Sequence, residues 1–370
     1  MTEQEHNNVQ WRKAKLGNCL SIGNGCDYKH LKEGDIPVFG TGGIMTYVDN
    51  YLYDGETVCI GRKGTINHPM YHIGKIWTVD TLFYTHSFVD VIPKFIYYAF
   101  CNIDWNKYNE ATGVPSLSKE TIYKIEIPVP FKDDKPDLPT QRRIAAILAS
   151  ADKVIAATQK TIAKYKQIKQ GMMEDLLKPK EGWKMVKLGE VGKISMCKRV
   201  FSFETSTEGE IPFYKIGTFG KDADAFISRQ LYEEYKSKFS YPKVGDILIS
   251  ASGTIGRTVV YDGEPAYFQD SNIIWIDNDE TIVLNQFLYY LYKTITWNLE
   301  GSTIARLYND NFNKIEISVP YKNDKPDLAE QRRIASILSG IDAKIATEEK
   351  VLEKYEKVKK GLMERLLEDR

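Results

Sequence analysis

The sequence predicts an α+β protein built from two mixed globules, each followed by a long helix. Three observations lead to this fold class. A stretch of about 55 residues occurs twice, the region before each copy alternates β-type runs with Gly-rich turns, and each copy carries apolar residues at heptad spacing. At 370 residues, the chain is long enough for two or three domains, each burying its own core.

The repeat defines the domain organisation. One copy starts at Lys124 and the other at Lys314, and 31 of 55 aligned positions are identical. Upstream, the halves match only in short pieces such as "TVCIGRKGTI" with "DILISASGTI". Pro179 and Gly182 interrupt the helical pattern between the halves. We therefore expect four segments, at residues 1–130, 131–179, 180–320 and 321–370.

Each globule is expected to mix strands with one helix. The runs "ETVCIG", "IWTVDTLFYT", "DILISA" and "TVVYDG" favour strands, while "KFIYYAFCNI" and "NQFLYYLYKTI" favour helices. The matching segments "IEIPVPF" and "IEISVPY" predict a strand that closes each globule.

The start of each long helix carries a capping signal. Asp137 and Asp327 are predicted N-caps, and Glu330, three residues after the second, predicts a capping box. Pro139 is compatible with the first turn. Both helices should therefore begin directly after the "KPD" tripeptides.

The apolar positions of both helices follow steps of four and three residues. The first stripe contains Ile144, Leu148, Ala151, Ile155, Thr158, Ile162 and Tyr165, and the second Ile334, Leu338, Ile341, Ile345, Glu348, Leu352 and Tyr355. The stripe then slips to Ile168, Met172, Leu176 and to Val358, Leu362, Leu366. No globule of this size covers a helix about 57 Å long. The simplest burial is one helix against the other as a coiled coil, with homodimerisation as the alternative.

Gly171 and Gly361 occupy the same repeat position inside the helices. A glycine inside a helix lowers the stability of the helix by about 1 kcal/mol relative to alanine. Their duplication predicts a close crossing with another backbone, or a bend.

Composition restricts the function classes. The net charge is zero, and the four segments carry about −2, +4, −3 and +1, so no basic footprint supports nucleic-acid binding. The start "MTEQEHNNVQW" lacks a secretory layout and no run of about 18 apolar residues exists, so we expect a cytoplasmic protein without a membrane span. The five cysteines form no CxxC pair, which favours reduced thiols.

Polar side chains on Gly-flanked loops are candidates for DNA contact, because Arg and Lys bind guanine edges or phosphates, Asn pairs with adenine, and hydroxyl groups suit either. In the first globule these are Thr41, Arg62, Lys63, Thr65 and Asn67. In the second they are Lys215, Ser250, Ser252, Thr254, Arg257, Gln269, Ser271, Asn272, Ser302, Thr303 and Arg306. Ordinary surface turns would explain the same residues.

The sequence lacks the motifs of a metal site, a dinucleotide-binding site and a DNA methyltransferase. His68 and His72 have no companion Cys or carboxylate at ligand spacing, so no metal site is expected. The stretch "FGTGGIMTY" lacks the strand–GxGxxG–helix context of a dinucleotide site, and no NPPY or DPPY methyltransferase motif occurs. We expect no cofactor and no catalytic residue.

The order of a globule, "KPDLxxQRRIAxIL" and a helix ending in "GxMExLL", repeated once, resembles the specificity subunit of type I restriction-modification enzymes. The resemblance covers nearly the whole chain. It implies that each globule is a target-recognition domain for one half of a bipartite double-stranded DNA site, without catalytic activity. It also implies that the helices pack antiparallel, set the spacing, and dock two methyltransferase subunits and, through them, the restriction–translocase subunits.

The helix residues expected to serve docking or helix pairing share the repeated arm. They are Gln141, Arg142, Arg143, Ile144, Leu148, Ile155, Ile162, Tyr165, Gln331, Arg332, Arg333, Ile334, Leu338, Ile345, Leu352 and Tyr355. The neutral charge leaves open a coiled-coil adaptor whose globules bind protein.

Overall fold

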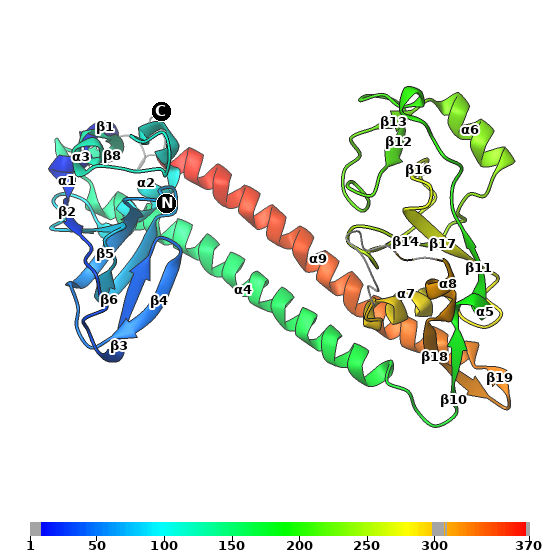
Figure 1. Cartoon of the computed structure of the whole chain (residues 1–370). Coiled ribbons are helices and arrows are strands. Elements are labelled where there is room, and N and C mark those ends of the chain that lie inside the picture. Colours follow the sequence, from blue (N-terminus) through cyan, green and yellow to red (C-terminus); the bar gives the residue numbers. More distant parts are fainter. Residues whose placement is uncertain (1–8, 298–306, 308, 368–370) are drawn as a thin grey trace, which may run out of the picture. The chain divides into compact units, whose positions relative to one another are not determined.

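The computed structural model describes residues 9–297, 307 and 309–367, and the chain forms two compact units. Unit 1 comprises residues 1–161 and 348–370, and unit 2 comprises residues 162–347. Helix α4 (Leu138–Leu176) begins in unit 1 and ends in unit 2, whereas α9 (Leu328–Leu367) begins in unit 2 and ends in unit 1 (Figure 1). Each unit therefore contains one globule, the start of one long helix and the end of the other.

Unit 1 is built on a six-stranded sheet in the order β2-β7-β5-β6-β3-β4, beside a smaller sheet in the order β1-β8-β9. Its strands are β1 (Gln10–Lys15), β2 (Ser21–Asn24), β3 (Glu33–Gly40), β4 (Gly43–Val48), β5 (Tyr53–Gly61), β6 (Met70–Thr78), β7 (Leu82–His86), β8 (Glu126–Lys132) and β9 (Lys135–Pro136). Its short helices are α1 (Leu16–Cys19), α2 (Pro93–Asn102), η2 (Trp105–Tyr108) and α3 (Lys119–Lys124).

Unit 2 repeats this plan with shorter strands, in sheets ordered β11-β17-β14-β15, β13-β12-β16 and β10-β18-β19. The strands are β10 (Trp183–Lys187), β11 (Gly192–Ser195), β12 (Ile211–Tyr214), β13 (Phe226–Ile227), β14 (Ile247–Ser250), β15 (Thr258–Val260), β16 (Tyr267–Phe268), β17 (Ile273–Asn278), β18 (Glu316–Lys322) and β19 (Lys325–Pro326). The helices are α5 (Leu188–Val191), η3 (Ser202–Glu204), α6 (Arg229–Lys238), α7 (Asn285–Thr294) and α8 (Asn309–Lys314).

The α+β class and the duplicated plan are confirmed, with one correction to the strands. The run "IWTVDTLFYT" is two strands, β6 and β7, because the chain turns at residues 79–81. The backbone shows the internal repeat: Leu16 N donates to Ile125 O, and Leu188 N donates to Ile315 O, the repeat equivalent of Ile125. The closing strands β8 and β18 and the helices α2 and α7 lie where the sequence predicts them.

The caps of the long helices are partly as predicted. The Asp137 carboxylate accepts from Thr140 N at 3.2 Å, and the Asp327 carboxylate accepts from Glu330 N at 3.0 Å. The predicted capping box is wrong. Glu330 instead pairs with Arg333 at 2.7 Å, and Asp327 N donates to Pro320 O, so the cap donor already has a partner.

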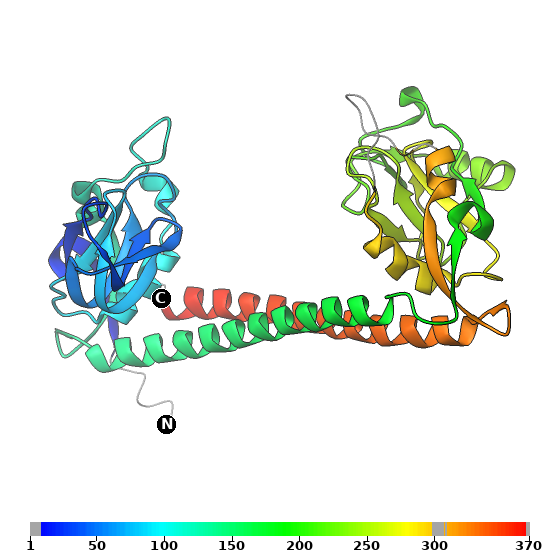
Figure 2. The same ribbon diagram turned by 60° about the horizontal axis from the view of Figure 1, so that its bottom comes forward.

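The helices pack antiparallel within each unit. In unit 1, Leu366 and Leu367 of α9 belong to the core around Ile144 and Leu148 of α4, whereas Lys359, further back along α9, pairs with Asp152, further along α4. In unit 2 the end of α4, including Met173 and Leu177, packs in the core that holds Ile334 and Leu338. Figure 2 shows the two helices running beside each other in each unit.

The slipped end of the predicted stripe is only partly buried. Ile168 and Val358 are 38% and 56% exposed and lie off the packed face, whereas Met172, Leu176, Leu362 and Leu366 pack against the cores of their units. Apart from the backbone of its own helix, a Cβ atom at Gly171 or Gly361 would meet no atom of the described residues within 4 Å. Within the described part of the chain, neither glycine lies at a close backbone crossing.

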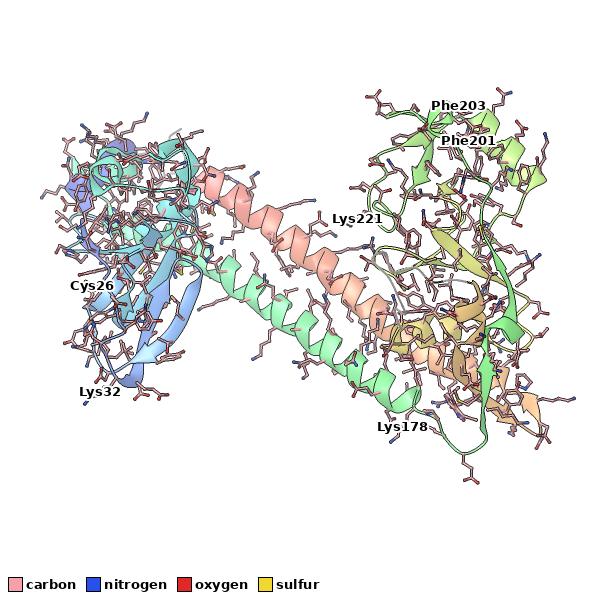
Figure 3. All side chains as sticks on the ribbon, in the orientation of Figure 1. Cys26, Lys32, Lys178, Phe201, Phe203 and Lys221 are labelled. Atoms are coloured by element: carbon pink, nitrogen blue, oxygen red, sulfur yellow. The ribbon has the colours of Figure 1, made fainter. Side chains whose placement is uncertain are left out.

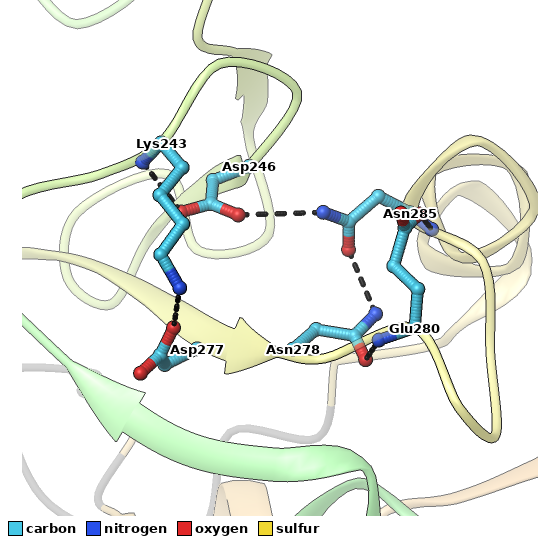
Figure 4. Close-up of polar contacts among 6 residues, drawn as sticks. All are labelled: Lys243, Asp246, Asp277, Asn278, Glu280 and Asn285. Atoms are coloured by element: carbon cyan, nitrogen blue, oxygen red, sulfur yellow. Dashed lines mark hydrogen bonds and ion pairs between the residues drawn. The ribbon is translucent and has the colours of Figure 1, made fainter.

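A polar network in unit 2 joins the strands to α7 (Figure 4). The buried Asp246 accepts from Lys243 N at 2.8 Å and from Asn285 Nδ2 at 3.3 Å. Asn278 Nδ2 donates to Asn285 Oδ1 at 2.8 Å, and Glu280 Oε1 accepts from Asn285 N at 2.7 Å. The network satisfies the polar groups where β17 ends and α7 begins.

Asp246 gives a pH prediction. Burial raises the pKa of its carboxyl above the usual value. The folded state therefore binds more protons than the unfolded state between the two pKa values, and stability falls as pH rises through that window. The free energy of unfolding falls by up to about 1.4 kcal/mol per pH unit in this window, and Asp246→Asn should remove this dependence. Urea unfolding followed by circular dichroism, from about pH 2.5 to about pH 7, covers the windows of both carboxyl groups.

Asp279→Asn is the matched control with the opposite sign. Hydrogen bonds from Thr281 hold the pKa of Asp279 below its usual value, so its contribution is present at higher pH and lost as pH falls. If both variants change the slope in the same direction, the assignment to Asp246 is wrong.

Candidate nucleic-acid interface

Three loops of unit 2 meet to form the second loop cluster, defined as residues 214–221, 250–257 and 268–272. Gln269 connects two of them, because its Oε1 accepts from Ile216 N at 3.0 Å and its N donates to Tyr214 O at 2.9 Å. Arg257 Nη1 donates to Phe219 O at 2.8 Å, and Ser252 Oγ donates to Asn272 Oδ1 at 2.8 Å. The cluster contains eight of the residues proposed from the sequence: Lys215, Ser250, Ser252, Thr254, Arg257, Gln269, Ser271 and Asn272.

Ser250 shapes this cluster from inside. It is 1% exposed, its hydroxyl donates to Thr254 O at 2.5 Å and it accepts from Arg257 N at 2.9 Å. Both hydrogen bonds close the turn that presents Thr254, which is exposed. Ser250 is therefore a positioning residue of the turn.

Ser250→Ala should lower the free energy of unfolding by about 1–3 kcal/mol, because a buried turn loses its internal partner. Ser252→Ala is the control, since its hydroxyl is only partly buried and makes one side-chain hydrogen bond. Chemical denaturation of both variants measures the difference. Equal losses would contradict the role given to Ser250.

Charged groups surround the second loop cluster. Arg199 Nε pairs with Asp270 at 2.9 Å, and Lys215 Nζ pairs with Asp224 at 2.8 Å. The Arg199 and Lys215 side chains are 61% and 42% exposed, so the guanidinium and the ammonium group are both within reach of a partner. The Lys215–Asp224 pair is exposed on both sides, and ion pairs of this kind contribute little to stability. Asp270 is only 18% exposed, so the Arg199 pair is shielded on its carboxylate side.

Unit 1 forms a first loop cluster around a hollow of about 620 Å³. The hollow is lined by residues 27–29, 40–45 and 79–81, including Thr41, and the loop 62–66 is hydrogen-bonded to the lining residue Thr81. Both Arg62 N and Lys63 N donate to Thr81 O, at 2.8 and 3.2 Å. The cluster thus brings Thr41 together with the loop that carries Arg62, Lys63 and Thr65.

The basic side chains of the first loop cluster are available. Arg62 and Lys63 are exposed, while their backbones are fixed by Thr81 and by the donation from Leu117 N to Arg62 O at 2.9 Å. Gly61 permits the bend that precedes them, because a Cβ there would lie 2.0 Å from Thr65 O. The Arg62 guanidinium also donates to Asp80 O at 3.4 Å, yet it stays exposed. A fixed backbone with exposed cationic side chains suits an anionic ligand.

The two loop clusters share one pattern of backbone hydrogen bonds, which we call the backbone frame. Leu117 N donates to Arg62 O, and Leu307 N donates to the equivalent Ala251 O; Arg62 N donates to Thr81 O, and Ala251 N donates to Asn272 O. The side chains on this frame differ: Arg62 and Lys63 in unit 1 are replaced by Ala251 and Ser252 in unit 2. One scaffold therefore presents two different surfaces.

Several proposed residues stay outside these clusters. Asn67 is exposed beyond the loop 62–66, and no contact among the described residues connects it to the hollow. Ser302, Thr303 and Arg306 lie outside the described residues. The ring of His72 contacts Lys75 O at 3.1 Å, and no group of three or more His, Cys, Asp or Glu side chains in the described part of the chain could hold a metal ion.

The structure also adds residues that sequence patterns did not single out. Phe201 and Phe203 stack on each other with ring centroids 5.7 Å apart, and they are 49% and 83% exposed (Figure 3). Ile44 and Met45 are 51% and 58% exposed at the hollow of unit 1. We add both pairs to the candidate residues, because adjoining exposed apolar side chains occur at binding surfaces. The only sequence signal would have been apolar residues within otherwise polar loops.

The repeated glutamines have a different role from the one expected. Gln141 is fully buried; its Oε1 accepts from Ile92 N at 3.0 Å and its Nε2 donates to Asp90 O at 3.1 Å. Gln331 makes the same pair with Leu284 N and Ile282 O. They fasten each helix to the globule before it and offer no docking surface. Arg142, Arg143, Arg332 and Arg333 beside them are exposed.

The remaining arm residues line the helix packing. Ile144, Leu148, Ile162, Ile334, Leu338 and Ile345 are buried, Ile155, Tyr165 and Leu352 are half-buried, and Tyr355 is 40% exposed. Although α4 and α9 are long, no helix in the described ranges is apolar enough to cross a membrane.

Comparison with known proteins gives one consistent family. The family model for the type I restriction modification DNA specificity domain matches residues 8–168 and again residues 180–357. A Haemophilus influenzae protein that carries the name of a type I restriction enzyme specificity subunit is 43% identical over 323 residues, covering 83% of this chain and 80% of that protein. The MjaVIII specificity subunit of Methanocaldococcus jannaschii is 28% identical over 350 residues, covering 85% and 77%.

Solved structures share the fold. The crystal structure of a type I restriction-modification S subunit from M. genitalium aligns with a TM-score of 0.68 at 18% identity, covering 98% of both chains. A chain from a study of complex assembly and conformational transition of the type I system aligns with a TM-score of 0.54 at 15% identity, again over 98% of both. At these identities the likeness establishes the fold.

Proposed function

Because this chain belongs to the type I restriction-modification DNA specificity family, we propose that it is the non-catalytic subunit that reads a bipartite DNA site, one half with each loop cluster. The observation that supports this proposal is that the same backbone frame occurs in both globules, with different side chains on its loops. Two unlike readers in one chain recognise an asymmetric, split sequence.

The long helices serve two tasks in this proposal. They set the number of unread base pairs between the half-sites, and they dock two methyltransferase subunits, through which the restriction–translocase subunits bind. A helix of 39 residues is about 58 Å long, or about one and a half turns of B-DNA. The internal repeat supports the docking of two identical partners, because it provides equivalent surfaces twice.

The decisive experiment selects DNA from a random library with the purified chain and its methyltransferase partner. A split motif with a fixed gap is the expected result. Replacing residues 1–130 by the first globule of another family member should change one half of that motif only. Retention of no sequence-selective DNA, even with the partner present, would favour the protein-binding adaptor suggested by the neutral charge. The chain alone should bind weakly, because few phosphates are neutralised.

Gly171 and Gly361 give a separate test of docking. Because a Cβ at either position would meet no other element of the described residues, Gly171→Ala and Gly361→Ala should each stabilise the chain by about 1 kcal/mol. Beside them, Ile168 and Val358 are exposed, which suits a closely packed partner helix. The larger Gly171→Leu and Gly361→Leu should therefore each weaken one of two partner sites without unfolding the chain.

Calorimetric titration with the methyltransferase subunit measures this. The expected stoichiometry falls from two partners to one in each single variant, while the melting temperature does not fall, because leucine favours the helix over glycine. Lys160→Leu, on an exposed position of α4, is the control for adding a leucine. Two partners bound with unchanged affinity in both variants would place docking elsewhere.

A further inference from the structure

Two polar clusters occupy repeat-equivalent places. In unit 1, the Asp152 carboxylate of α4 accepts from Tyr98 OH of α2 at 2.7 Å and from Lys359 Nζ of α9 at 2.6 Å. In unit 2, the Asp342 carboxylate of α9 accepts from Tyr290 OH of α7 at 2.8 Å and from Lys169 Nζ of α4 at 2.6 Å. Each triad therefore joins a globule, the start of one long helix and the end of the other.

The triads are shielded from water. The two Asp and two Lys side chains are only 22–34% exposed, and Tyr98 and Tyr290 are buried. The surface pair Lys357–Glu353 on α9 is, by contrast, 74% and 62% exposed. Burial, and then the hydrogen bond to Asp152, raise the pKa of Tyr98, so its hydroxyl remains a donor. Removing one partner leaves a charge in a partly shielded place, which costs more than losing a surface pair.

Both ion pairs specify the same helix register. For antiparallel helices, the numbers of residues that face each other add to a constant. The pair Asp152–Lys359 and the pair Lys169–Asp342 both add to 511. Two separate contacts, one in each unit, thus agree on one alignment of α4 with α9.

Apolar packing alone discriminates poorly between registers, because the stripe repeats every seven residues. The triads do discriminate. Sliding the helices by one heptad in one direction changes the constant to 504, which sets Asp152 opposite Leu352 and Asp342 opposite Ile162. Sliding in the other direction changes it to 518, which sets Asp152 opposite Leu366 and Asp342 opposite Leu176. Either slide places a carboxylate against an apolar side chain and separates it from its lysine.

We propose that the triads Tyr98–Asp152–Lys359 and Tyr290–Asp342–Lys169 are positioning residues that select the register of α4 against α9. By selecting this register, the triads also fix the gap between the half-sites, and this second role rests on the proposed function. A buried polar group that specifies register is the best established use of such groups in helix pairs. The globules bind the same carboxylates through Tyr98 and Tyr290, so register and globule attachment are coupled.

The test measures register directly and needs no DNA, so its outcome is independent of the proposed function. Spin labels are placed at Lys153→Cys and Lys350→Cys, two exposed positions of unit 1, with Cys26→Ser removing the exposed native thiol. Double electron–electron resonance on this chain should give one narrow distance. Asp152→Leu with Asp342→Leu should add populations in which the helices are displaced along their axis by about 10 Å, one heptad at 1.5 Å per residue.

Controls separate register from general stability. Lys357→Met removes a lysine from an exposed pair on the same helix and should leave the distance unchanged. Exchanging the charges, with Asp152→Lys, Lys359→Asp, Asp342→Lys and Lys169→Asp, should restore one narrow distance. If the leucine variant fails to fold by circular dichroism, Lys169→Met with Lys359→Met replaces it. A folded variant that keeps the single wild-type distance would overturn the proposal.

Discussion

Replacing Arg62 and Lys63 together by alanine should abolish recognition of one half-site and leave the sequence of the other unchanged. Both side chains are exposed at the end of a loop whose backbone is fixed by Thr81 and Leu117. Contacts of Arg or Lys with a base edge are worth about 1–3 kcal/mol each, so affinity for the intact site should fall on the order of 100-fold or more. Selection of DNA with the methyltransferase partner present measures both affinity and motif.

Lys160→Ala with Lys164→Ala is the control for this pair. It removes the same two positive charges from exposed positions of α4. A general electrostatic effect would weaken both double variants equally, and the salt dependence of binding would then be the same. Only the loop variant should lose half of the motif. If the motif persists whole in the Arg62 and Lys63 variant, the first loop cluster does not read DNA.

The parts of the fold that repeat were predictable because their signals are local. The caps at Asp137 and Asp327, the strands β8 and β18, and the helices α2 and α7 follow from residue type and period. The turn inside "IWTVDTLFYT" was missed because β6 and β7 are both apolar and the turn between them, residues 79–81, carries no Gly or Pro. Hydrophobic periodicity does not mark such a turn.

The long-range contacts of the repeat were not predictable from its pattern. Gln141 and Gln331 belong to a surface-like sequence, yet both are fully buried because each satisfies a loop of its own globule. The reverse holds for Gly171 and Gly361, whose duplication predicted a close crossing or a bend, and neither of which meets another element among the described residues. A single sequence does not distinguish a residue kept for its own fold from one kept for a partner.

The candidate site shows the same limit. Residue type placed Ser250 among DNA contacts, and its hydroxyl is consumed by the turn. Residue type could not indicate that Gln269, Arg257 and Asn272 meet, since tertiary packing of three loops brings them together. The backbone frame, rather than the side chains, is what the two globules share.

Lengthening both long helices by one heptad should lengthen the gap between the half-sites by about 3 base pairs. The interval from Asp152 to Lys169 on α4 equals the interval from Asp342 to Lys359 on α9, and both ion pairs form only when these two intervals match. Duplicating residues 154–160 and 344–350 keeps them matched and adds about 10 Å to the helix pair. About 3 base pairs also rotate the duplex by roughly a third of a turn, so affinity should fall while the preferred gap grows.

Duplicating residues 154–160 alone is the control, and it follows from the same geometry. The interval from Asp152 to Lys169 grows by one heptad while the interval from Asp342 to Lys359 stays as it is, so one of the two triads must break. This variant should have a lower melting temperature and no single preferred gap, whereas the double variant should keep the wild-type melting temperature. Methylation of a library of spacer lengths by the reconstituted complex measures the gap. A single insertion that lengthens the gap as cleanly as the double one would show that the two helices do not act as one matched ruler.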